Sequence, residues 1–117
     1  MVKVLTIPDR WSAKDIPDLT GKRYLITGAT SGIGLAAATE LARRNAQVVI
    51  TARSVEKARD AIKKIGPGLV DYLLMDLTDL ESVRKAAARV DKAFDVVVLN
   101  AGVMATPFMK TTDGFEL

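Results

Sequence analysis

The stretch that most constrains the fold is residues 27–34, with the sequence TGATSGIG. It follows a short apolar run at residues 24–26 and opens an alanine-rich stretch of helical character. Three glycines at this join, Gly28, Gly32 and Gly34, are typical of a strand that turns tightly into a helix. Such a turn lets the backbone approach a diphosphate closely, and the free N–H groups of the helix start favour the negative charge. The stretch therefore predicts a dinucleotide-binding domain.

Composition excludes several classes of function. The chain has 117 residues, 49% of them hydrophobic and 26% charged, which fits one ordered domain with a modest core. It contains no cysteine and no histidine, so disulfides, thiolate or imidazole metal sites and catalysis by Cys or His are excluded. The net charge is +3, and the basic residues are scattered over helical stretches and form no basic run. We therefore expect no metal site and no nucleic-acid partner.

The start of the chain and its apolar runs bear on location. The N-terminal sequence MVKVLTIPDRW has no long apolar segment, so no signal peptide is expected. No apolar run reaches the length of a membrane span. The lack of cysteine is compatible with a reducing compartment. We expect a cytoplasmic protein.

Hydrophobic periodicity predicts alternating strands and helices after a short arm. Residues 1–22 form the arm and residues 23–117 the domain. Strands are expected at 23–27, 47–51, 69–75 and 95–99, and helices at 32–44, 55–65 and 79–90. Because crossovers that contain a helix join parallel strands, this order predicts half of a doubly wound α/β sheet with strand order 3-2-1-4, truncated after the fourth strand.

The same patterns predict faces and helix starts. The expected buried stripes are Ile33, Ala37 and Leu41 in the first helix, Val55, Ala58, Ile62 and Ile65 in the second, and Leu80, Val83, Ala87 and Val90 in the third. Thr78 and Glu81 fit a capping box at the start of the third helix. The continuous apolar run of the fourth strand, DVVVL, predicts burial on both faces of that strand.

The end of the chain carries two further signals. Asp113, followed three residues later by Glu116, is typical of a helix start, yet the sequence stops one residue later. The fourth strand would also be left as an exposed apolar sheet edge. Both observations predict a fragment of a longer protein, or a chain that self-associates or meets a partner at that edge.

Three motifs in this order resemble the short-chain dehydrogenase/reductase family. Residues 27–34 match its TGxxxGxG motif in full, and Asp76 with Leu77 matches its acidic position after the third strand. Residues 100–102 match the end of its NNAG motif, with Leu99 in place of the first Asn. The arm sequence DIPDLTGK and the closing TTDGFEL are similar to the subgroup of retinol-dehydrogenase-like and WW-domain-oxidoreductase-like enzymes. The resemblance covers roughly residues 11–117 and implies a Rossmann-type fold.

The resemblance also implies a nicotinamide dinucleotide cofactor and residues that bind it. The glycine turn would hold the diphosphate, Asp76 and Leu77 would contact the adenine, and Asn100 would tie the fourth strand to its neighbour. The expected cofactor-binding residues are Gly28, Thr30, Ser31, Gly32, Ile33, Gly34, Arg53, Asp76, Leu77, Asn100, Ala101 and Gly102.

The end of the second predicted strand favours NADP(H) over NAD(H). An acidic residue there binds the ribose hydroxyls and repels a 2′-phosphate. Here the strand ends in Thr51, Ala52 and Arg53, so a guanidinium, which pairs well with phosphate, stands beside the expected site. The alternative is that Arg53 only precedes the helix and points to solvent.

The residues that carry the family's chemistry are not found in this chain. The family uses a Tyr as acid/base, a Lys four residues later and a Ser, whereas Gly28 follows Tyr24 and Asp76 follows Tyr72 at that spacing. We therefore assign no catalytic residue.

Two functions remain open. The first is the NADP(H)-binding portion of an oxidoreductase that acts on a small-molecule carbonyl or alcohol, with missing downstream residues supplying the proton. The second is a non-catalytic dinucleotide-binding or interaction module completed by a partner chain. For the first, Met104, Phe108 and Met109 are candidates for one wall of an apolar substrate pocket.

Overall fold

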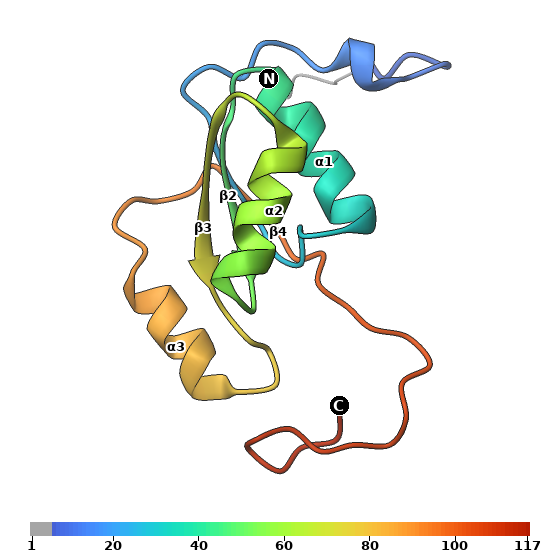
Figure 1. Cartoon of the computed structure of the whole chain (residues 1–117). Helices are drawn as coiled ribbons and strands as arrows, with labels where there is room; N and C mark the ends of the chain where they lie inside the picture. Colours follow the sequence, from blue (N-terminus) through green and yellow to red (C-terminus); the bar gives the residue numbers. More distant parts are fainter. Residues whose placement is uncertain (1–5) are drawn as a thin grey trace, which may run out of the picture.

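A four-stranded parallel sheet with three α-helices organises the computed structural model, which describes residues 6–117 (Figure 1). The first five residues of the predicted arm lie outside the described residues. The elements are η1 (Ala13–Asp15), β1 (Arg23–Ile26), α1 (Gly32–Arg43), β2 (Gln47–Ala52), α2 (Val55–Ile65), β3 (Leu69–Leu74), α3 (Leu80–Ala88) and β4 (Val96–Val98). The strand order is β3-β2-β1-β4 and each pairing is parallel, which confirms the predicted order 3-2-1-4.

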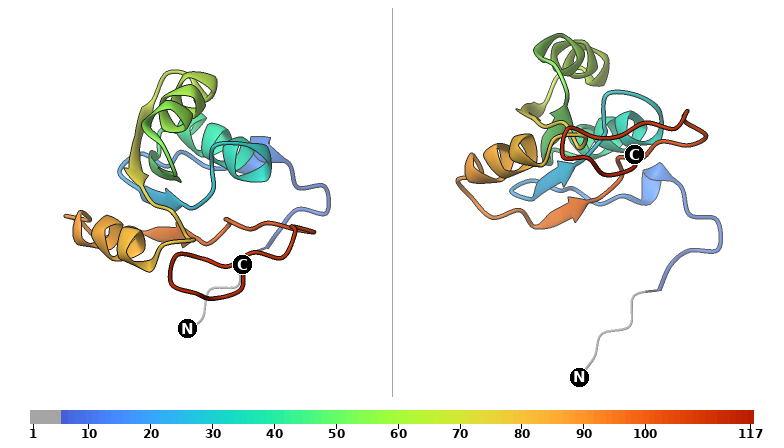
Figure 2. Two further views of the ribbon diagram at one scale, coloured as in Figure 1. Left: turned by 60° about the horizontal axis from the view of Figure 1, so that its bottom comes forward. Right: turned by 90° about the horizontal axis from the view of Figure 1, so that it is seen from below.

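The core lies between the sheet and two of the helices. α1 and α2 cover one face of the sheet, and α3 lies on the opposite side (Figure 2). The largest fully buried side chains are Ile26, Val48 and Ile50, all from the two central strands. Full burial of such a side chain stabilises the fold by about 1.5–3 kcal/mol. Small helix residues, with Ala38 and Ala58 fully buried, let the helices approach the sheet closely.

α1 is rotated by about one residue from the predicted orientation. Its buried residues are Gly34, Ala38 and Ala42, and Ile33 is 82% exposed, so the prediction that Ile33 faces the core was wrong. The reason is a backbone contact at the start of the helix. Gly34 lies against the Gly28 carbonyl oxygen, and this contact sets which side of α1 meets the sheet.

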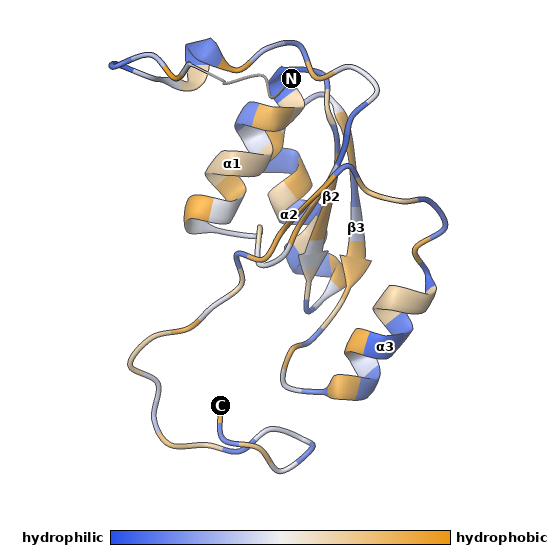
Figure 3. Cartoon of the chain, turned by 180° about the vertical axis from the view of Figure 1, so that it is seen from behind, coloured by the Kyte–Doolittle hydropathy of each residue, from blue (hydrophilic) through white to orange (hydrophobic). Residues whose placement is uncertain are grey.

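The second face of the sheet is largely open within this chain. Val96 and Val97 of β4 are 40% and 50% exposed, so the predicted burial of β4 on both faces was wrong, whereas its exposure as a sheet edge was predicted. Figure 3 shows this side from behind, with apolar strands left uncovered and α3 beside them.

α3 does not bury the predicted stripe. Its buried residue is Ala86, while Leu80 is 39% exposed and Ala87 and Val90 are also exposed. The reason is the position of the helix, because α3 contacts mainly β3, and Val96 and Val97 of β4 stay exposed. A stripe of apolar residues is buried only where another element lies against it.

Two residues that were predicted to begin helices have other roles in the structure. The N-cap of α3 is Asp79, whose carboxylate accepts a hydrogen bond from Glu81 N at 3.1 Å, so the Thr78 capping box was wrong. Thr78 is drawn away because Asp76 accepts hydrogen bonds from both its N–H and its hydroxyl. Asp113 does not begin a helix. It lies in a turn and accepts a hydrogen bond from Leu80 N at 2.8 Å.

The segment before β1 is anchored to the C-terminal end of α1. Leu19 is buried in the core, and its N–H donates to the Arg44 carbonyl at 2.7 Å. Asn45 donates from its side chain to Asp18 at 2.9 Å. The hydrogen bonds from Asn45 and Thr20 hold the pKa of Asp18 below its ordinary value.

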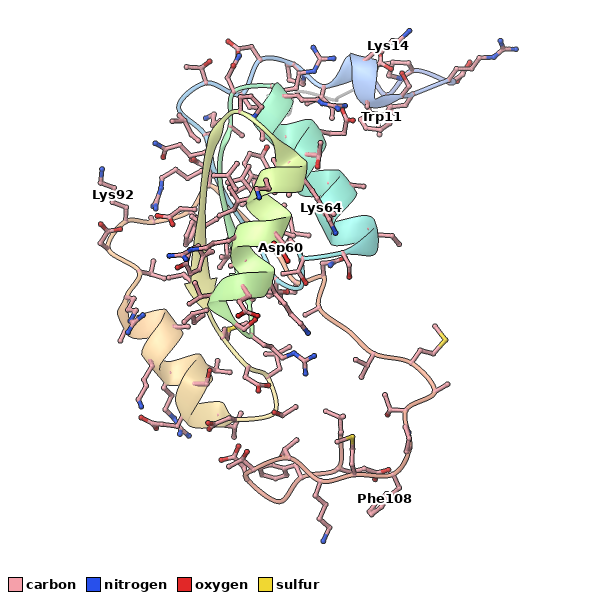
Figure 4. All side chains as sticks on the ribbon, viewed as in Figure 1. Trp11, Lys14, Asp60, Lys64, Lys92 and Phe108 are labelled. Carbon is pink, nitrogen blue, oxygen red and sulfur yellow. The ribbon has the colours of Figure 1, made fainter. Side chains whose placement is uncertain are left out.

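Among the other described residues of this segment, Ile16 packs against the core, whereas its one tryptophan does not. Trp11 is 55% exposed and stands on the arm, away from the sheet (Figure 4). In the part of the chain that the structure describes, every helix is too short or too polar to cross a bilayer.

Candidate functional site

A cleft with a volume of about 550 Å³ opens at the carboxyl ends of the four strands. This is the edge at which open parallel sheets bind ligands, and the volume falls in the range of small-molecule sites. The predicted cofactor residues that line it are Gly28, Thr30, Ser31, Ile33, Gly34, Arg53, Asp76, Leu77, Asn100, Ala101 and Gly102. Gly32 is the one predicted residue that does not line it. The fold thus brings together segments that follow four different strands.

Two glycines of the turn have neighbours that leave no room for a side chain. Gly28 has a φ of +66°, and a Cβ added there would lie 2.7 Å from the Cα of Ala101. A Cβ on Gly34 would lie 2.5 Å from Nδ2 of Asn100 and 2.7 Å from the Gly28 carbonyl oxygen. Gly32 also has a positive φ, +59°, but no atom within 4 Å of an added Cβ. Gly28 and Gly34 therefore permit the close approach of neighbouring atoms. Gly32 is needed only because its φ is positive, a conformation that glycine adopts without steric cost.

Thr27 and Asn100 join the turn after β1 to the turn after β4. The buried hydroxyl of Thr27 accepts hydrogen bonds from the N–H groups of Asn100 and Ala101, both at 3.0 Å. The Asn100 side-chain amide donates to the carbonyl oxygens of Thr27 at 3.1 Å and Gly28 at 3.3 Å. Asn100 thus makes the predicted tie between the fourth strand and its neighbour. Together these hydrogen bonds hold the floor of the cleft in one geometry.

A second buried hydroxyl supports the same turn from β2. Thr51 accepts a hydrogen bond from Gly28 N at 3.2 Å and is buried. Neither Thr27 nor Thr51 was in the predicted site. That prediction named residues expected to contact the cofactor, whereas these two hydroxyls accept hydrogen bonds from backbone N–H groups of the turns. Thr27 begins the glycine motif, but nothing in a β-branched run distinguishes Thr51 from a packing residue.

The start of α1 leaves backbone donors for an anion. Ser31 is its N-cap but its side chain caps no N–H group, and the first turn holds no acidic residue. By contrast, the side chains of Ser54 and Asp79 accept hydrogen bonds at the starts of α2 and α3. The unpaired N–H groups of a first helical turn and the helix dipole attract negative charge. The uncapped start of α1 therefore faces the cleft with an electropositive end.

Cationic side chains that follow β2 also line the cleft. Arg53 follows β2 and Lys57 lies in the first turn of α2, and both line the cleft. Lys57 was not among the predicted site residues, because it lies within a predicted helix and belongs to no basic run. Its spacing of four residues from Arg53 was the available signal, since it places both residues near the same helix start.

Asp76, which also lines the cleft, is held as a carboxylate. One of its oxygens accepts hydrogen bonds from the Thr78 hydroxyl at 2.7 Å and from Thr78 N at 2.9 Å. The hydroxyl hydrogen bond is the largest cause that lowers the pKa of Asp76, followed by the backbone hydrogen bond and, more weakly, the charge of Arg53, while burial opposes them. Asp76 is therefore ionised at neutral pH.

Replacing Asp76 with asparagine is expected to remove a pH-dependent part of the stability. Because the folded pKa of Asp76 lies below its ordinary value, its contribution is present above about pH 4 and is lost as the pH falls through the folded pKa. Thermal unfolding from pH 7 to pH 2.5 should show wild type above Asp76→Asn at neutral pH and the two converging in acid. Asp60→Asn, at an exposed site on α2 (Figure 4), is the control. A gap that stays constant with pH contradicts the assignment.

The two tyrosines and the predicted substrate-pocket residues do not line the cleft, and several residues that were not predicted do. Tyr24 and Tyr72 pack against the core and do not line the cleft. Met104, Phe108 and Met109 are exposed and form none of its wall, and Figure 4 shows Phe108 on the outer side of the C-terminal segment. The lining residues that were not predicted are Thr51, Ala52, Lys57, Met75, Thr78, Val103 and Leu117.

Comparison with known proteins adds sequence evidence to this geometry. The short chain dehydrogenase family model matches residues 22–115. The chain is 42% identical to an uncharacterized oxidoreductase of Schizosaccharomyces pombe, over 92% of this chain and 34% of the relative. It is also 42% identical to human retinol dehydrogenase 11, over 85% of this chain and 33% of that enzyme. The chain thus spans about a third of the length of the curated relatives it matches.

Solved structures share the architecture. An uncharacterized protein from Mycobacterium paratuberculosis superimposes with a TM-score of 0.84 at 44% identity, covering 91% of this chain and 39% of that one. L-sorbose reductase from Gluconobacter frateurii, solved with NADPH and L-sorbose, gives 0.65 at 32% identity, over 73% of this chain and 35% of the reductase. A 3-oxoacyl-[acyl-carrier protein] reductase from Brucella melitensis, solved with NAD, gives 0.68 at 25% identity, over 88% and 41%.

Proposed function

Because this chain belongs to the short-chain dehydrogenase family, we propose that it is the NADP(H)-binding portion of an oxidoreductase acting on a small-molecule carbonyl or alcohol. The relatives that support this proposal are oxidoreductases, retinol dehydrogenase 11 among them. The observation that carries it is the glycine cradle. Gly28 and Gly34 let the turns after β1 and β4 and the start of α1 approach so closely that an added Cβ would clash, and this tight turn lies beside the uncapped start of α1 at the carboxyl ends of the strands.

The residues around the cleft fit a dinucleotide. The N–H groups at the start of α1, near Ser31 and Ile33, would hold the diphosphate, since they are donors in an electropositive environment. Asp76 and Leu77 would line the adenine end, and the small residues Ala101 and Gly102 would leave room for a ribose. The cofactor supplies hydride transfer to or from a carbonyl carbon when it is bound, and this part of the chain would bind and orient it.

Charge favours NADP(H) over NAD(H). Arg53 and Lys57 line the cleft where β2 ends, and no carboxylate follows β2 at that point. Two cations there favour a 2′-phosphate, whereas a carboxylate would repel it. Related structures include complexes with NADPH and with NAD, so the preference proposed for this chain rests on these two side chains.

Replacing Arg53 with glutamate should reverse the charge beside the 2′-phosphate. We expect the ratio of NADP to NAD affinity to fall by about tenfold or more, which corresponds to about 1.4 kcal/mol. The measurement is titration of both dinucleotides by calorimetry or fluorescence. Arg59→Glu, an identical charge change at an exposed site on α2 outside the cleft, is the matched control. An unchanged ratio in Arg53→Glu would remove the NADP assignment, and a wild-type chain that binds neither dinucleotide would remove the whole proposal.

The wider assignments follow from the same proposal. Residues 1–22 would serve as an arm and residues 23–117 as the dinucleotide-binding domain. The enzyme's proton-transfer residues would lie outside this chain, so no catalytic residue is assigned here. We place the protein in the cytoplasm, without a nucleic-acid partner.

A second candidate function is a dinucleotide-binding module completed by a partner chain. The exposed edge and face of β4, where Val96 and Val97 are accessible, favour it, since such an edge can pair with another strand, including one from a second copy of this chain. The two functions differ in activity. NADPH oxidation with carbonyl substrates is measured for this chain and for the gene's full reading frame. Activity confined to a longer product supports the enzyme, and dinucleotide binding without a longer product supports the module.

A further inference from the structure

Residues 109–117 fold back on themselves beside the start of α3 (Figures 1 and 2). Thr111 N donates to the Phe115 carbonyl at 2.7 Å, and Lys110 pairs with Glu116 across the turn in an antiparallel bridge. These bonds close the segment on itself, and we call it the C-terminal hairpin. It is therefore a preformed turn that presents its tip, residues 112–114, to the rest of the molecule.

The tip of the hairpin holds the segment that joins β3 to α3. Asp113 Oδ2 accepts a hydrogen bond from Leu80 N at 2.8 Å, and Thr112 N donates to the Thr78 carbonyl at 2.9 Å. Both contacts span more than thirty residues of sequence. One reaches the first residue of α3 and the other a residue of the cleft wall.

That segment is itself one connected unit. Asp76 N donates to the Ser82 hydroxyl on α3 at 2.8 Å, and Asp76 accepts both hydrogen bonds from Thr78. Asp76 and Thr78 line the cleft, whereas Ser82 belongs to the first turn of α3. A contact that fixes the start of α3 therefore also fixes the backbone of the cleft wall.

Asp113 adds to a helix start that already has a cap. The carboxylate of Asp79 accepts from Glu81 N, which leaves Leu80 N for a second acceptor. Several N–H groups of a first helical turn lack partners inside the helix, and carboxylates are favoured there by the helix dipole. Asp113 supplies that acceptor from a distant part of the chain. It therefore links the C-terminal hairpin to the start of α3.

We propose that the C-terminal hairpin clamps the wall of the cleft formed by residues 76–78, with Asp113 as its positioning residue. The clamp is a contact within this chain. Its effect on ligand rests on the proposed function, in which this wall meets the adenine. Loosening the clamp should weaken binding of the adenosine half of the dinucleotide and leave the glycine cradle unchanged.

The first test is amide hydrogen exchange of the chain without dinucleotide. In Asp113→Ala the amides of residues 78–83 should exchange about fivefold to tenfold faster than in wild type, with β1 and β2 unchanged. Asp113→Asn, which keeps an acceptor oxygen, should restore part of the protection. Glu116→Ala is the matched control, because it removes a carboxylate of the same hairpin whose side chain accepts no hydrogen bond in the described residues. Unchanged exchange in Asp113→Ala, or equal acceleration in Glu116→Ala, overturns the clamp.

The second test measures affinity for adenosine 2′,5′-bisphosphate and for inorganic pyrophosphate. Asp113→Ala should weaken the bisphosphate about threefold to tenfold and leave pyrophosphate unchanged, since only the adenosine end meets the clamped wall. If wild type binds and Asp113→Ala binds equally well, the positioning role is overturned. If wild type binds neither ligand, the proposed function fails instead, and the exchange experiment decides the clamp independently.

Discussion

Replacing Gly28 with alanine is expected to lower the free energy of unfolding by about 3 kcal/mol, through conformational strain and overpacking. Gly28 has a φ of +66°, in the left-handed region that costs an L-residue about 1–2 kcal/mol. The added Cβ would also lie 2.7 Å from the Cα of Ala101. Because Ala101 Cα is a backbone atom, the clash is relieved only by separating the turns that follow β1 and β4.

That separation should also damage the cleft. Gly28 and Ala101 both line it, so dinucleotide affinity in Gly28→Ala should fall at least about tenfold. Urea denaturation followed by circular dichroism gives the stability, and calorimetry gives the affinity. Gly32→Ala is the matched control, because Gly32 has a φ of +59° but open space around an added Cβ. It should lose only the conformational cost, about 1–2 kcal/mol. Equal losses in the two variants would contradict the close-approach role of Gly28.

Replacing Thr27 with valine is expected to cost about 2 kcal/mol of stability, since a buried donor left without a partner costs about 1–3 kcal/mol. The Thr27 hydroxyl accepts from two N–H groups, those of Asn100 and Ala101, and valine offers neither an acceptor in its side chain nor space for water in the same volume. The Asn100 N–H keeps a second acceptor, the Val98 carbonyl at 3.1 Å, whereas the Ala101 N–H loses its acceptor. Because Ala101 lines the cleft, binding should weaken together with stability.

Two variants separate the hydroxyl from the methyl group. Thr27→Ser keeps the acceptor and should lose only about 1 kcal/mol, the value of one buried methyl group. Thr39→Val is a control for loss of a threonine hydroxyl elsewhere, because the Thr39 hydroxyl donates to a helix carbonyl, that of Leu35, and accepts no N–H group among the described hydrogen bonds. Urea denaturation of the three variants gives the comparison. A Thr27→Ser variant as unstable as Thr27→Val would show that the hydroxyl is not the cause.

The element order was predictable because its signals are local. Glycine turns, β-branched runs and apolar spacing each act within a few residues. A connection that contains a helix usually joins two parallel strands, so the element order also predicted a parallel sheet. The strand order β3-β2-β1-β4 followed from that pattern and was confirmed. The motif positions around Gly28, Asp76 and Asn100 also converged on one cleft, because the carboxyl ends of parallel strands lie at one edge of the sheet.

The failures share a different cause. The periodicity of α1 and α3 indicated which residues share a face, but not which face another element covers. Ile33 turned outward because the contact of Gly34 with Gly28 set the rotation of α1. Val97 is half exposed, and α3 contacts mainly β3. Burial is a property of neighbours, so it was decided only by packing.

By itself, the sequence determined that a strand, a glycine turn and a helix would form around residues 27–34, and that three more strands would join the first in one parallel sheet. Those outcomes depend on backbone conformation and short-range spacing. The tertiary structure alone decided which groups complete the turn, because hydrogen bonds form between segments that only the fold brings together. Thr27 accepts a hydrogen bond from Asn100 across more than seventy residues, and Asp113 accepts one from Leu80 at the start of α3 from thirty-three residues away. The local sequence around a donor or an acceptor does not identify the distant group with which it will form a hydrogen bond.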